Sequence, residues 1–158
     1  MPNCFMLIGI PGSGKSTWAR NYLKSVPHQQ WVLVSSDDFI EIAAMQSGKT
    51  YTEVFSEHAD EAQRSCYDLV QKSASVGMNI IWDQTNLSKK VRKHRLNMLP
   101  AYYQKYFYLF PTPEPEELAR RLASRPDKFI PKHIIENMIK NFEPPVIGQE
   151  GFIGQISG

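Results

Sequence analysis

The chain has 158 residues, of which 42% are apolar and 22% are charged, and its formal net charge at pH 7 is +2. This length is typical of one domain with a sizeable core, and the composition is that of a globular protein, which excludes disordered and fibrous classes. The small net charge also excludes a polycation that binds anions over its whole surface. We therefore expect a single domain over residues 1–158.

The two cysteines and the N-terminal segment give no sign of secretion, of a zinc site or of a membrane span. Cys4 falls in an apolar run and Cys66 in a helical pattern, and neither belongs to a CxxC pair or a His/Cys cluster. Isolated thiols of this kind are typical of reduced core residues in the cytosol. The apolar run in MPNCFMLIG is too short for a signal peptide or a membrane helix. We expect a cytoplasmic protein without a membrane partner, and leave its phage or cellular origin and its oligomeric state open.

Apolar runs alternate with helical patterns along the whole chain. Short runs rich in β-branched and aromatic residues predict strands at residues 4–8, 31–34, 78–82 and 106–110, with a weaker strand near 152–156. Helical spacing of apolar residues, with capping residues and prolines, predicts helices at residues 16–23, 36–43, 53–75, 88–100, 112–125 and 132–142. This alternation predicts an α/β fold with a mostly parallel sheet, whose ligands bind at the carboxyl ends of the strands.

Residues 9–16 read GIPGSGKS and match the phosphate-binding motif G-x-x-x-x-G-K-[ST], between the first predicted strand and the first predicted helix. Glycines allow the loop's N–H groups to surround phosphate oxygens, and the helix N-terminus adds partial positive charge. Lys15 is expected to reach the β- and γ-phosphates of ATP, and Ser16 to bind the Mg²⁺ that bridges them. The residues expected to bind ATP in this loop are Gly12, Ser13, Gly14, Lys15, Ser16 and Thr17. The motif predicts a P-loop NTPase-type three-layer fold, with helices flanking the sheet.

Two adjacent acids, Asp37 and Asp38, follow the second predicted strand and so belong to the same sheet edge as the P-loop. A phosphotransferase acting on a hydroxyl needs a carboxylate near the acceptor oxygen, to orient it and to accept its proton. We interpret Asp37 as this base and Asp38 as a capping or solvated residue. Two acids at a helix start also have a purely structural interpretation, because they favour the helix dipole. The chain has no N-K-x-D motif, which argues against a GTPase.

A third polar cluster follows the third predicted strand, where residues 82–95 read WDQTNLSKKVRKHR. Asp83, Thr85 and Asn86 leave that strand at the same sheet edge and are expected to contact the acceptor, and Asp83 is also placed to hold Mg²⁺. From residue 84 to residue 113 the chain has six Lys or Arg and no Asp or Glu. Such a stretch of one sign on a mildly acidic body indicates an anionic partner at one place.

The basic residues of this stretch fall on the helix predicted at 88–100. Its apolar face is formed by Leu87, Val91, His94 and Met98. This pattern predicts an amphipathic helix that packs on the sheet by its apolar face and leaves its cations outside. We expect an acceptor-binding rim that contains Arg92 with some of Lys89, Lys90 and Lys93. A solvated polar face without a ligand is the alternative.

These motifs together resemble the polynucleotide 5′-hydroxyl kinase family. PGSGKSTWAR at 11–20 is similar to its P-loop, SDDF at 36–39 to its Arg-Asp-Asp-aromatic element, and DQTN at 83–86 to its D-x-T-N signature. Arg121 and Arg125, followed by an Ile-Pro pair, resemble the family's lid, here about residues 121–131. FEPP at 142–145 with EGF at 150–152 resembles the end of its kinase domain. The resemblance covers nearly the whole chain, and the order and spacing of the five elements are more specific than the P-loop alone.

The resemblance implies roles for individual residues. Asp37 would be the general base, and Lys15 and Ser16 would contact the phosphates and the metal. Arg121 would hold ATP phosphates, and Arg125 would stabilise the transferring phosphoryl group. The alternative for both arginines is a solvated helix end, although the proline after Arg125 favours a mobile lid.

Two positions depart from the family's pattern, and one motif is absent. Ile40 stands where the phage member of the family has an Arg that contacts the acceptor phosphate. Gln84 separates the acid from the Thr-Asn pair, as in the mammalian member but not in the phage member. No D-x-D-G-T motif is present, so the phosphatase half of some relatives is not expected. A DQTN element also occurs in a nuclear RNA-binding protein whose P-loop domain is not an established kinase.

Three functions follow from this pattern. The first is ATP-dependent phosphorylation of the 5′-hydroxyl of RNA or DNA, with the nucleic-acid end as acceptor. The second is a kinase of a small hydroxylated metabolite or antibiotic, and the third is a nucleotide-binding, nucleic-acid-associated module without transfer activity. The basic helix favours the first over the second, because a small neutral acceptor needs no cationic rim. Asp37 and Arg125 together argue against the third.

Overall fold

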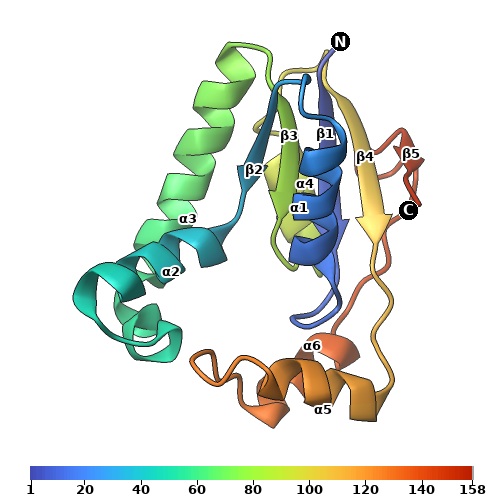
Figure 1. The fold of residues 1–158 in the computed structure, drawn as a ribbon. Helices are drawn as coiled ribbons and strands as arrows, with labels where there is room; N and C mark the ends of the chain where they lie inside the picture. Colours follow the sequence, from blue (N-terminus) through green and yellow to red (C-terminus); the bar gives the residue numbers. More distant parts are fainter. Residues whose placement is uncertain (158) are drawn as a thin grey trace.

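The computed structural model describes residues 1–157 and has a five-stranded sheet at its centre (Figure 1). The strands pair in parallel throughout, in the order β2-β3-β1-β4-β5. Their bounds are β1 Asn3–Ile8, β2 Trp31–Val34, β3 Asn79–Asp83, β4 Gln104–Leu109 and β5 Gly154–Gln155. The predicted α/β fold with a parallel sheet is confirmed.

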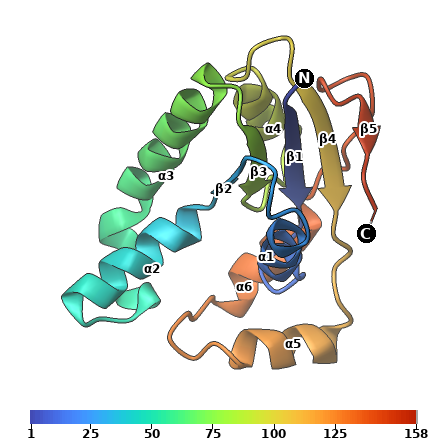
Figure 2. The ribbon, with the colours of Figure 1, turned by 45° about the horizontal axis from the view of Figure 1, so that its top comes forward.

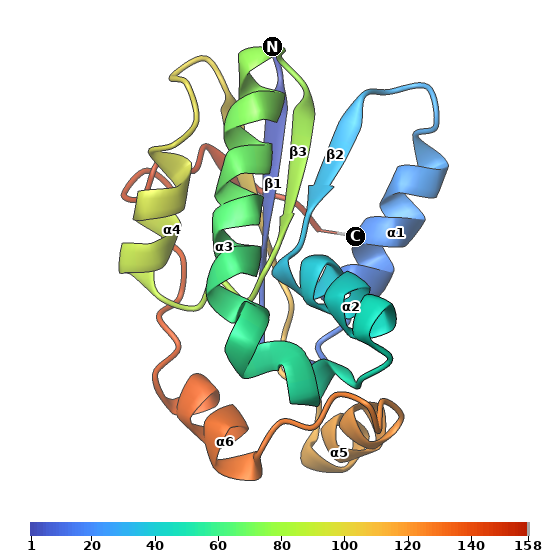
Figure 3. The ribbon, with the colours of Figure 1, turned by 90° about the vertical axis from the view of Figure 1, so that its left-hand side faces the viewer.

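Helices flank this sheet and extend beyond one edge of it. They are α1 Lys15–Ser25, α2 Ser36–Ser47, α3 Tyr51–Ser75, α4 Lys89–Leu96, α5 Pro115–Ala123 and α6 Lys132–Lys140. Seen from the side, α3 and α4 lie on one face of the sheet and α1 on the other (Figure 3). The last two helices, α5 and α6, lie beyond the carboxyl ends of the strands (Figures 1 and 2), and in Figure 1 both lie below the turn that leads into α1.

The central strand β1 is buried on both faces of the sheet. Cys4, Met6 and Ile8 are 0% exposed and belong to the core that α3 and α4 cover. Leu7 is also 0% exposed but belongs to the opposite core, together with Ala19 of α1. A strand covered on both faces has a continuous apolar sequence rather than an alternating one, which is the pattern that this segment shows.

Most element boundaries lie within a few residues of the predicted ones. The long helix α3 begins at Tyr51, two residues before its predicted start, because Thr50 caps it. The Thr50 side chain accepts a hydrogen bond from the Glu53 amide, and the Glu53 carboxylate accepts one from the Thr50 amide, which forms a capping box. The helix α5 begins at Pro115, with Pro at its first position, rather than at Thr112.

The face that α4 turns toward the interior differs from the predicted one. Val91 and His94 are exposed, whereas Arg92, Arg95 and Leu96 are buried. Hydrophobic periodicity alone places arginines outside, but here the interior offers hydrogen-bond acceptors to both guanidinium groups. The amphipathic helix is therefore present, and its orientation about its own axis is set by polar rather than apolar contacts.

Candidate functional site

Three polar segments meet at the carboxyl edge of the sheet, where the neighbouring strands β2, β3 and β1 end. The strand β1 leads into the P-loop, β2 into the start of α2, and β3 into residues 84–86. The Gly9 amide donates a hydrogen bond to the Thr85 carbonyl oxygen at 3.1 Å, which joins the first of these segments to the third. The edge thus brings together Lys15, Asp37 and Asp83, each from a different segment.

The P-loop requires glycine at several positions for two different reasons. Gly12 and Gly14 have φ angles of 84° and 100°, in the left-handed region that L side chains rarely adopt. At Gly9 the reason is space, because a Cβ would lie 2.6 Å from the Ser13 hydroxyl oxygen. That hydroxyl is buried and has no hydrogen-bond partner within the described residues. The loop thus leaves a polar group unsatisfied beside the N-terminus of α1, as a phosphate cradle would.

Lys15 is held inside the loop rather than in solvent. The residue is 8% exposed, and its ammonium group donates a hydrogen bond to the Ile10 carbonyl oxygen at 2.9 Å. Burial lowers the pKa of Lys15 to about 8, and the neighbouring Asp83 and Asp37 carboxylates oppose that shift. Lys15 is therefore a buried cation with few partners. Its attraction to a bound phosphate is strong because burial weakens the screening between the two charges.

Ser16 and Asp83, the two residues predicted to bind Mg²⁺, lie next to each other at this edge. The Ser16 hydroxyl donates a hydrogen bond to Asp83 Oδ2 at 2.7 Å. Burial raises the pKa of the Asp83 carboxyl, while this hydrogen bond and the Lys15 charge lower it. Within residues 1–157 no group of three or more His, Cys, Asp or Glu could hold a metal. The pair fits a Mg²⁺ that takes its other ligands from phosphates and water, as this ion does in phosphotransferases.

Asp37 is bonded through both carboxylate oxygens. The Tyr51 hydroxyl donates to Oδ1 at 2.7 Å, and the Lys128 ammonium group donates to Oδ2. Burial raises the pKa of Asp37, but the Lys128 charge, these two hydrogen bonds and the Arg125 charge together bring that pKa below its usual value. Asp37 is thus ionised and oriented, as a general base must be. The adjacent Asp38 instead faces α1 and pairs with Arg20 at 3.3 Å.

The lid segment, residues 121–131, begins on α5 and contacts the P-loop through its first arginine. Arg121 Nη1 donates a hydrogen bond to the Gly12 carbonyl oxygen at 3.0 Å, and its Nε donates to Glu117 at 2.8 Å. Leu118 of the same helix packs against Gly12, where an added Cβ would lie 3.0 Å from it. Arg125 instead pairs with Glu41 of α2 at 2.7 Å. The two predicted lid arginines therefore reach different sides of the site.

Asn86 and Arg92 are interior residues, which differs from their expected place at an acceptor-binding surface. Asn86 is 1% exposed and has a φ of 51°, and its amide donates to the Leu7 carbonyl oxygen at 2.8 Å. Arg92 is 0% exposed, pairs with Glu150 at 2.9 Å and donates to the Asn86 carbonyl oxygen at 2.9 Å. A completely covered guanidinium cannot bind a ligand at the rim. Arg92 and Asn86 instead brace residues 84–86, and the exposed cations of α4 are Lys89, Lys90 and Lys93.

Three polar residues at the site, Gln84, Lys128 and Tyr51, were not among the predicted site residues. Gln84 accepts a hydrogen bond from the Trp82 indole at 2.9 Å and donates to Ser36 and Gln63 at 3.0 Å and 2.9 Å. This amide links the ends of β2 and β3 to α3. Lys128 and Tyr51 lie in a loop and at a helix start whose compositions are ordinary. The structure alone shows that these residues belong to the site.

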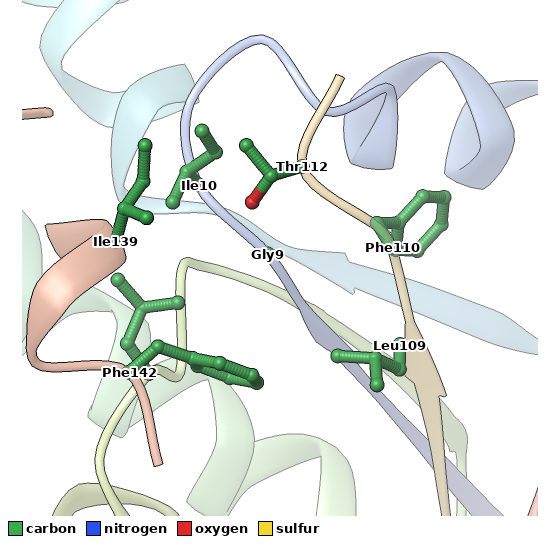
Figure 4. A pocket seen from close by; sticks show the side chains of 8 residues that line it. Gly9, Ile10, Leu109, Phe110, Thr112, Ile139 and Phe142 are labelled. Carbon is green, nitrogen blue, oxygen red and sulfur yellow. The ribbon is translucent and has the colours of Figure 1, made fainter. Parts of the chain in front are cut away.

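A small cavity lies at the start of the P-loop. It has a volume of about 110 Å³, and its lining is largely apolar (Figure 4). The lining residues are Gly9, Ile10, Leu87, Leu109, Phe110, Thr112, Ile139 and Phe142. Side chains that follow β4 and those at the end of α6 thus pack around the loop. The lining of this cavity contains none of the predicted catalytic side chains.

A family model and a curated relative match most of the chain. The model describes an AAA domain and matches residues 5–145. Heterogeneous nuclear ribonucleoprotein U-like protein 2 of Mus musculus is 26% identical over 147 residues, which is 89% of this chain and 19% of that protein. The chain therefore spans about a fifth of the length of this relative.

Solved structures give similarities of two kinds. A chain of the Pnkp1/Rnl/Hen1 RNA repair complex is 30% identical with a TM-score of 0.68, over 89% of this chain and 43% of that chain. A gluconokinase from Sinorhizobium meliloti is 16% identical with a TM-score of 0.56, over 99% of this chain and 84% of that chain, and this likeness shows the fold alone. The first similarity agrees with the resemblance that the motifs indicated. No helix in residues 1–157 combines the length and apolar character needed to cross a membrane.

Proposed function

The chain belongs to the AAA-domain family and has the fold of P-loop kinases, and we propose that it transfers the γ-phosphoryl group of ATP to the 5′-hydroxyl of a polynucleotide. The observation that carries this proposal is the Asp37 carboxylate, which is kept ionised at the same sheet edge as the P-loop. A protein that only binds a nucleotide needs no such carboxylate. The similarity to a chain of an RNA repair complex supports a nucleic-acid acceptor.

The proposed reaction uses residues from all three segments and from the lid segment. The acceptor hydroxyl donates its proton to Asp37 while its oxygen attacks the γ-phosphorus, and the bond between that phosphorus and the β–γ bridging oxygen breaks to release ADP. Lys15 and the P-loop amides hold the β- and γ-phosphates throughout. Ser16 and Asp83 would hold a Mg²⁺ ion, which would neutralise charge on those phosphates.

The two lid arginines would each contact a different part of the bound ATP. Arg121 already lies against Gly12 of the P-loop and is placed to contact ATP phosphates. Arg125 is half-exposed in its pair with Glu41, so it is free to exchange that carboxylate for the transferring phosphoryl group. An arginine that stabilises this group in other phosphotransferases raises kcat by about 10³-fold or more.

The exposed lysines of α4 support a polyanionic acceptor. Lys89, Lys90 and Lys93 are exposed, and their helix follows directly from residues 84–86 at the site. Together they would bind phosphates of the acceptor strand and make its affinity depend on salt. Thr85, which is partly buried at the sheet edge, is the remaining acceptor contact that we propose from the D-x-T-N element.

Two other functions each have an observation in their favour. The fold is shared with a gluconokinase over 84% of that chain, so the fold by itself also suits a kinase of a small hydroxylated acceptor. The similarity to the ribonucleoprotein U-like protein supports a nucleotide-binding module in an RNA-associated protein. Asp37 disfavours the module, and the basic exposed face of α4 disfavours the small acceptor.

The test is transfer of label from γ-labelled ATP to 5′-hydroxyl oligonucleotides of RNA and DNA, and in parallel to a panel of small alcohols. We expect transfer to oligonucleotides, with loss of about 10²-fold or more in Asp37→Asn. Asp38→Asn is the matched control, since the Asp38 carboxylate pairs with Arg20 of α1 and is not the proposed base, and it should keep most of the activity. Transfer to small alcohols but not to oligonucleotides would refute the polynucleotide acceptor and favour a small hydroxylated one. Equal rates in Asp37→Asn and wild type would refute the base.

A further inference from the structure

Lys128 connects the lid segment to the carboxylate of Asp37. Its ammonium group donates to Asp37 Oδ2 and lies 4.5 Å from the centre of the Tyr51 ring, whose hydroxyl bonds the other oxygen of the same carboxylate. The Lys128 side chain is 9% exposed, although its loop neighbours Asp127 and Phe129 are exposed. A buried ammonium group is costly unless it is paired, so the loop's position and this ion pair depend on each other.

Contacts on either side of Lys128 fix the loop against the start of α3. The Thr52 amide donates a hydrogen bond to the Asp127 carbonyl oxygen at 3.3 Å. The Phe129 amide donates one to the Thr52 hydroxyl at 2.8 Å. Lys128 lies between these two anchors, and the Arg125–Glu41 pair adds a further contact with α2. The lid segment is thus docked on the α2–α3 junction through four consecutive or nearly consecutive residues.

Charged and polar groups from several elements act on the Asp37 carboxylate. They are Lys128 and Arg125 of the lid segment, Tyr51 and Cys66 of α3, Lys15 of the P-loop, Asp83 of β3 and Asp38 of α2. After burial, which acts in the opposite direction, Lys128 has the largest effect and holds the carboxylate in its charged form. Each carboxylate oxygen keeps a further lone pair when Lys128 and Tyr51 are bonded to it, so an acceptor hydroxyl still has a partner.

We propose that Lys128 is a positioning residue for phosphoryl transfer, which orients the Asp37 carboxylate when the lid segment is docked. The acceptor hydroxyl therefore meets a correctly oriented base only in the docked state, and this couples lid docking to the start of the reaction. The inference rests on the proposed role of Asp37. It goes beyond that role because it gives the contact between the lid segment and Asp37 a function that is separate from the lid's contacts with the phosphates.

The experiment compares Lys128→Met and Lys128→Arg with wild type. Methionine keeps the length and apolar stem of the side chain and removes its charge, whereas arginine restores the charge. Lys132→Met is the matched control, because Lys132 is 91% exposed and makes only a distant pair with Glu136. Steady-state rates are measured over a range of pH at saturating and limiting acceptor.

We expect Lys128→Met to lower kcat by about tenfold or more with little change in the KM for ATP. The acid limb of its pH profile should move to higher pH, because the partly buried Asp37 carboxylate is protonated more easily without its cation. Lys128→Arg should return that limb toward its wild-type position, and Lys132→Met should match wild type. If Lys128→Met keeps the wild-type limb, and Lys128→Arg behaves as Lys128→Met does, the side chain only holds the loop and the proposal is overturned.

Hydrogen exchange separates failure of this inference from failure of the proposed function. The Phe129 amide is protected by its bond to Thr52 only while the lid segment is docked. Lys128→Met and Asp37→Asn should both speed its exchange, and Lys132→Met should not. Unchanged exchange in Lys128→Met overturns the coupling whatever the transfer assay gives. Absence of transfer in wild type, with faster exchange in both variants, refutes the proposed kinase and supports the link between Lys128 and Asp37.

Discussion

Replacing Arg92 by methionine tests the buried contacts that hold residues 84–86 in place. The Arg92 side chain is 0% exposed and that of Glu150 is 5% exposed. Arg92 Nε donates to Glu150 Oε1 at 2.9 Å, and Nη1 donates to the Asn86 carbonyl oxygen at 2.9 Å. Methionine fills much of the same apolar space but removes the charge and both donors, so it isolates the polar contribution.

The expected loss of stability follows from what remains buried. Glu150 keeps one hydrogen bond, from the Val146 amide at 3.0 Å, but loses its only buried cationic partner among residues 1–157. Breaking one side of a buried ion pair costs about 3–5 kcal/mol, and leaving a buried carbonyl without its donor costs about 1–3 kcal/mol. These two costs overlap, so we expect a decrease of about 4 kcal/mol in the free energy of unfolding. That is a large part of the roughly 5–15 kcal/mol of a typical domain.

Urea unfolding followed by tryptophan fluorescence measures this change, since Trp82 lies in the core that α4 covers. Arg120→Met is the matched control, because that side chain is 71% exposed, and its unfolding should stay close to wild type. The double variant Arg92→Met with Glu150→Met should be more stable than the sum of the single effects predicts, because no unpaired charge remains. A loss below about 1 kcal/mol in Arg92→Met, or strict additivity in the double variant, would refute the reasoning.

Two further predictions concern ligands. ATP affinity should fall as pH rises through about 8, because burial lowers the pKa of Lys15 to that value and only its charged form, which dominates below it, attracts phosphates. Calorimetry between about pH 7 and about pH 9, in buffers of different ionisation enthalpy, should show that the protein takes up protons when ATP binds. Lys15→Arg should abolish this uptake. An ATP affinity that does not change with pH would contradict the prediction. Replacing Lys89, Lys90 and Lys93 by glutamine should reduce the salt dependence of oligonucleotide binding. The slope of the logarithm of the binding constant against the logarithm of the salt concentration should become shallower by up to about 0.7 for each phosphate that a lysine neutralises in the wild type. Anisotropy titrations at several salt concentrations check this against Lys72→Gln on α3, and an unchanged slope would leave α4 as a solvated face.

The P-loop and the parallel sheet are determined by residues that are close together in the sequence. The glycines, Lys15 and Ser16 lie within eight consecutive positions between a strand and a helix, so local pattern is enough to indicate a phosphate cradle. The continuous apolar run of β1 likewise follows from burial on both faces. The topology of parallel strands then brings Asp37 and Asp83 to one edge without any knowledge of side-chain contacts.

The orientation of α4 and the partners of Asp37 depend on residues far apart in the sequence. A helical wheel ranks side chains by hydrophobicity, and so it places Arg92 outside. Glu150, 58 residues away, provides an interior partner that reverses this choice. Lys128 lies 91 residues from Asp37, in a loop with no distinguishing composition. Local sequence thus determined which chemistry this chain carries. Only the tertiary structure decided which cations are buried braces and which reach the site, because a charged side chain takes its place from the acceptor that other segments bring to it.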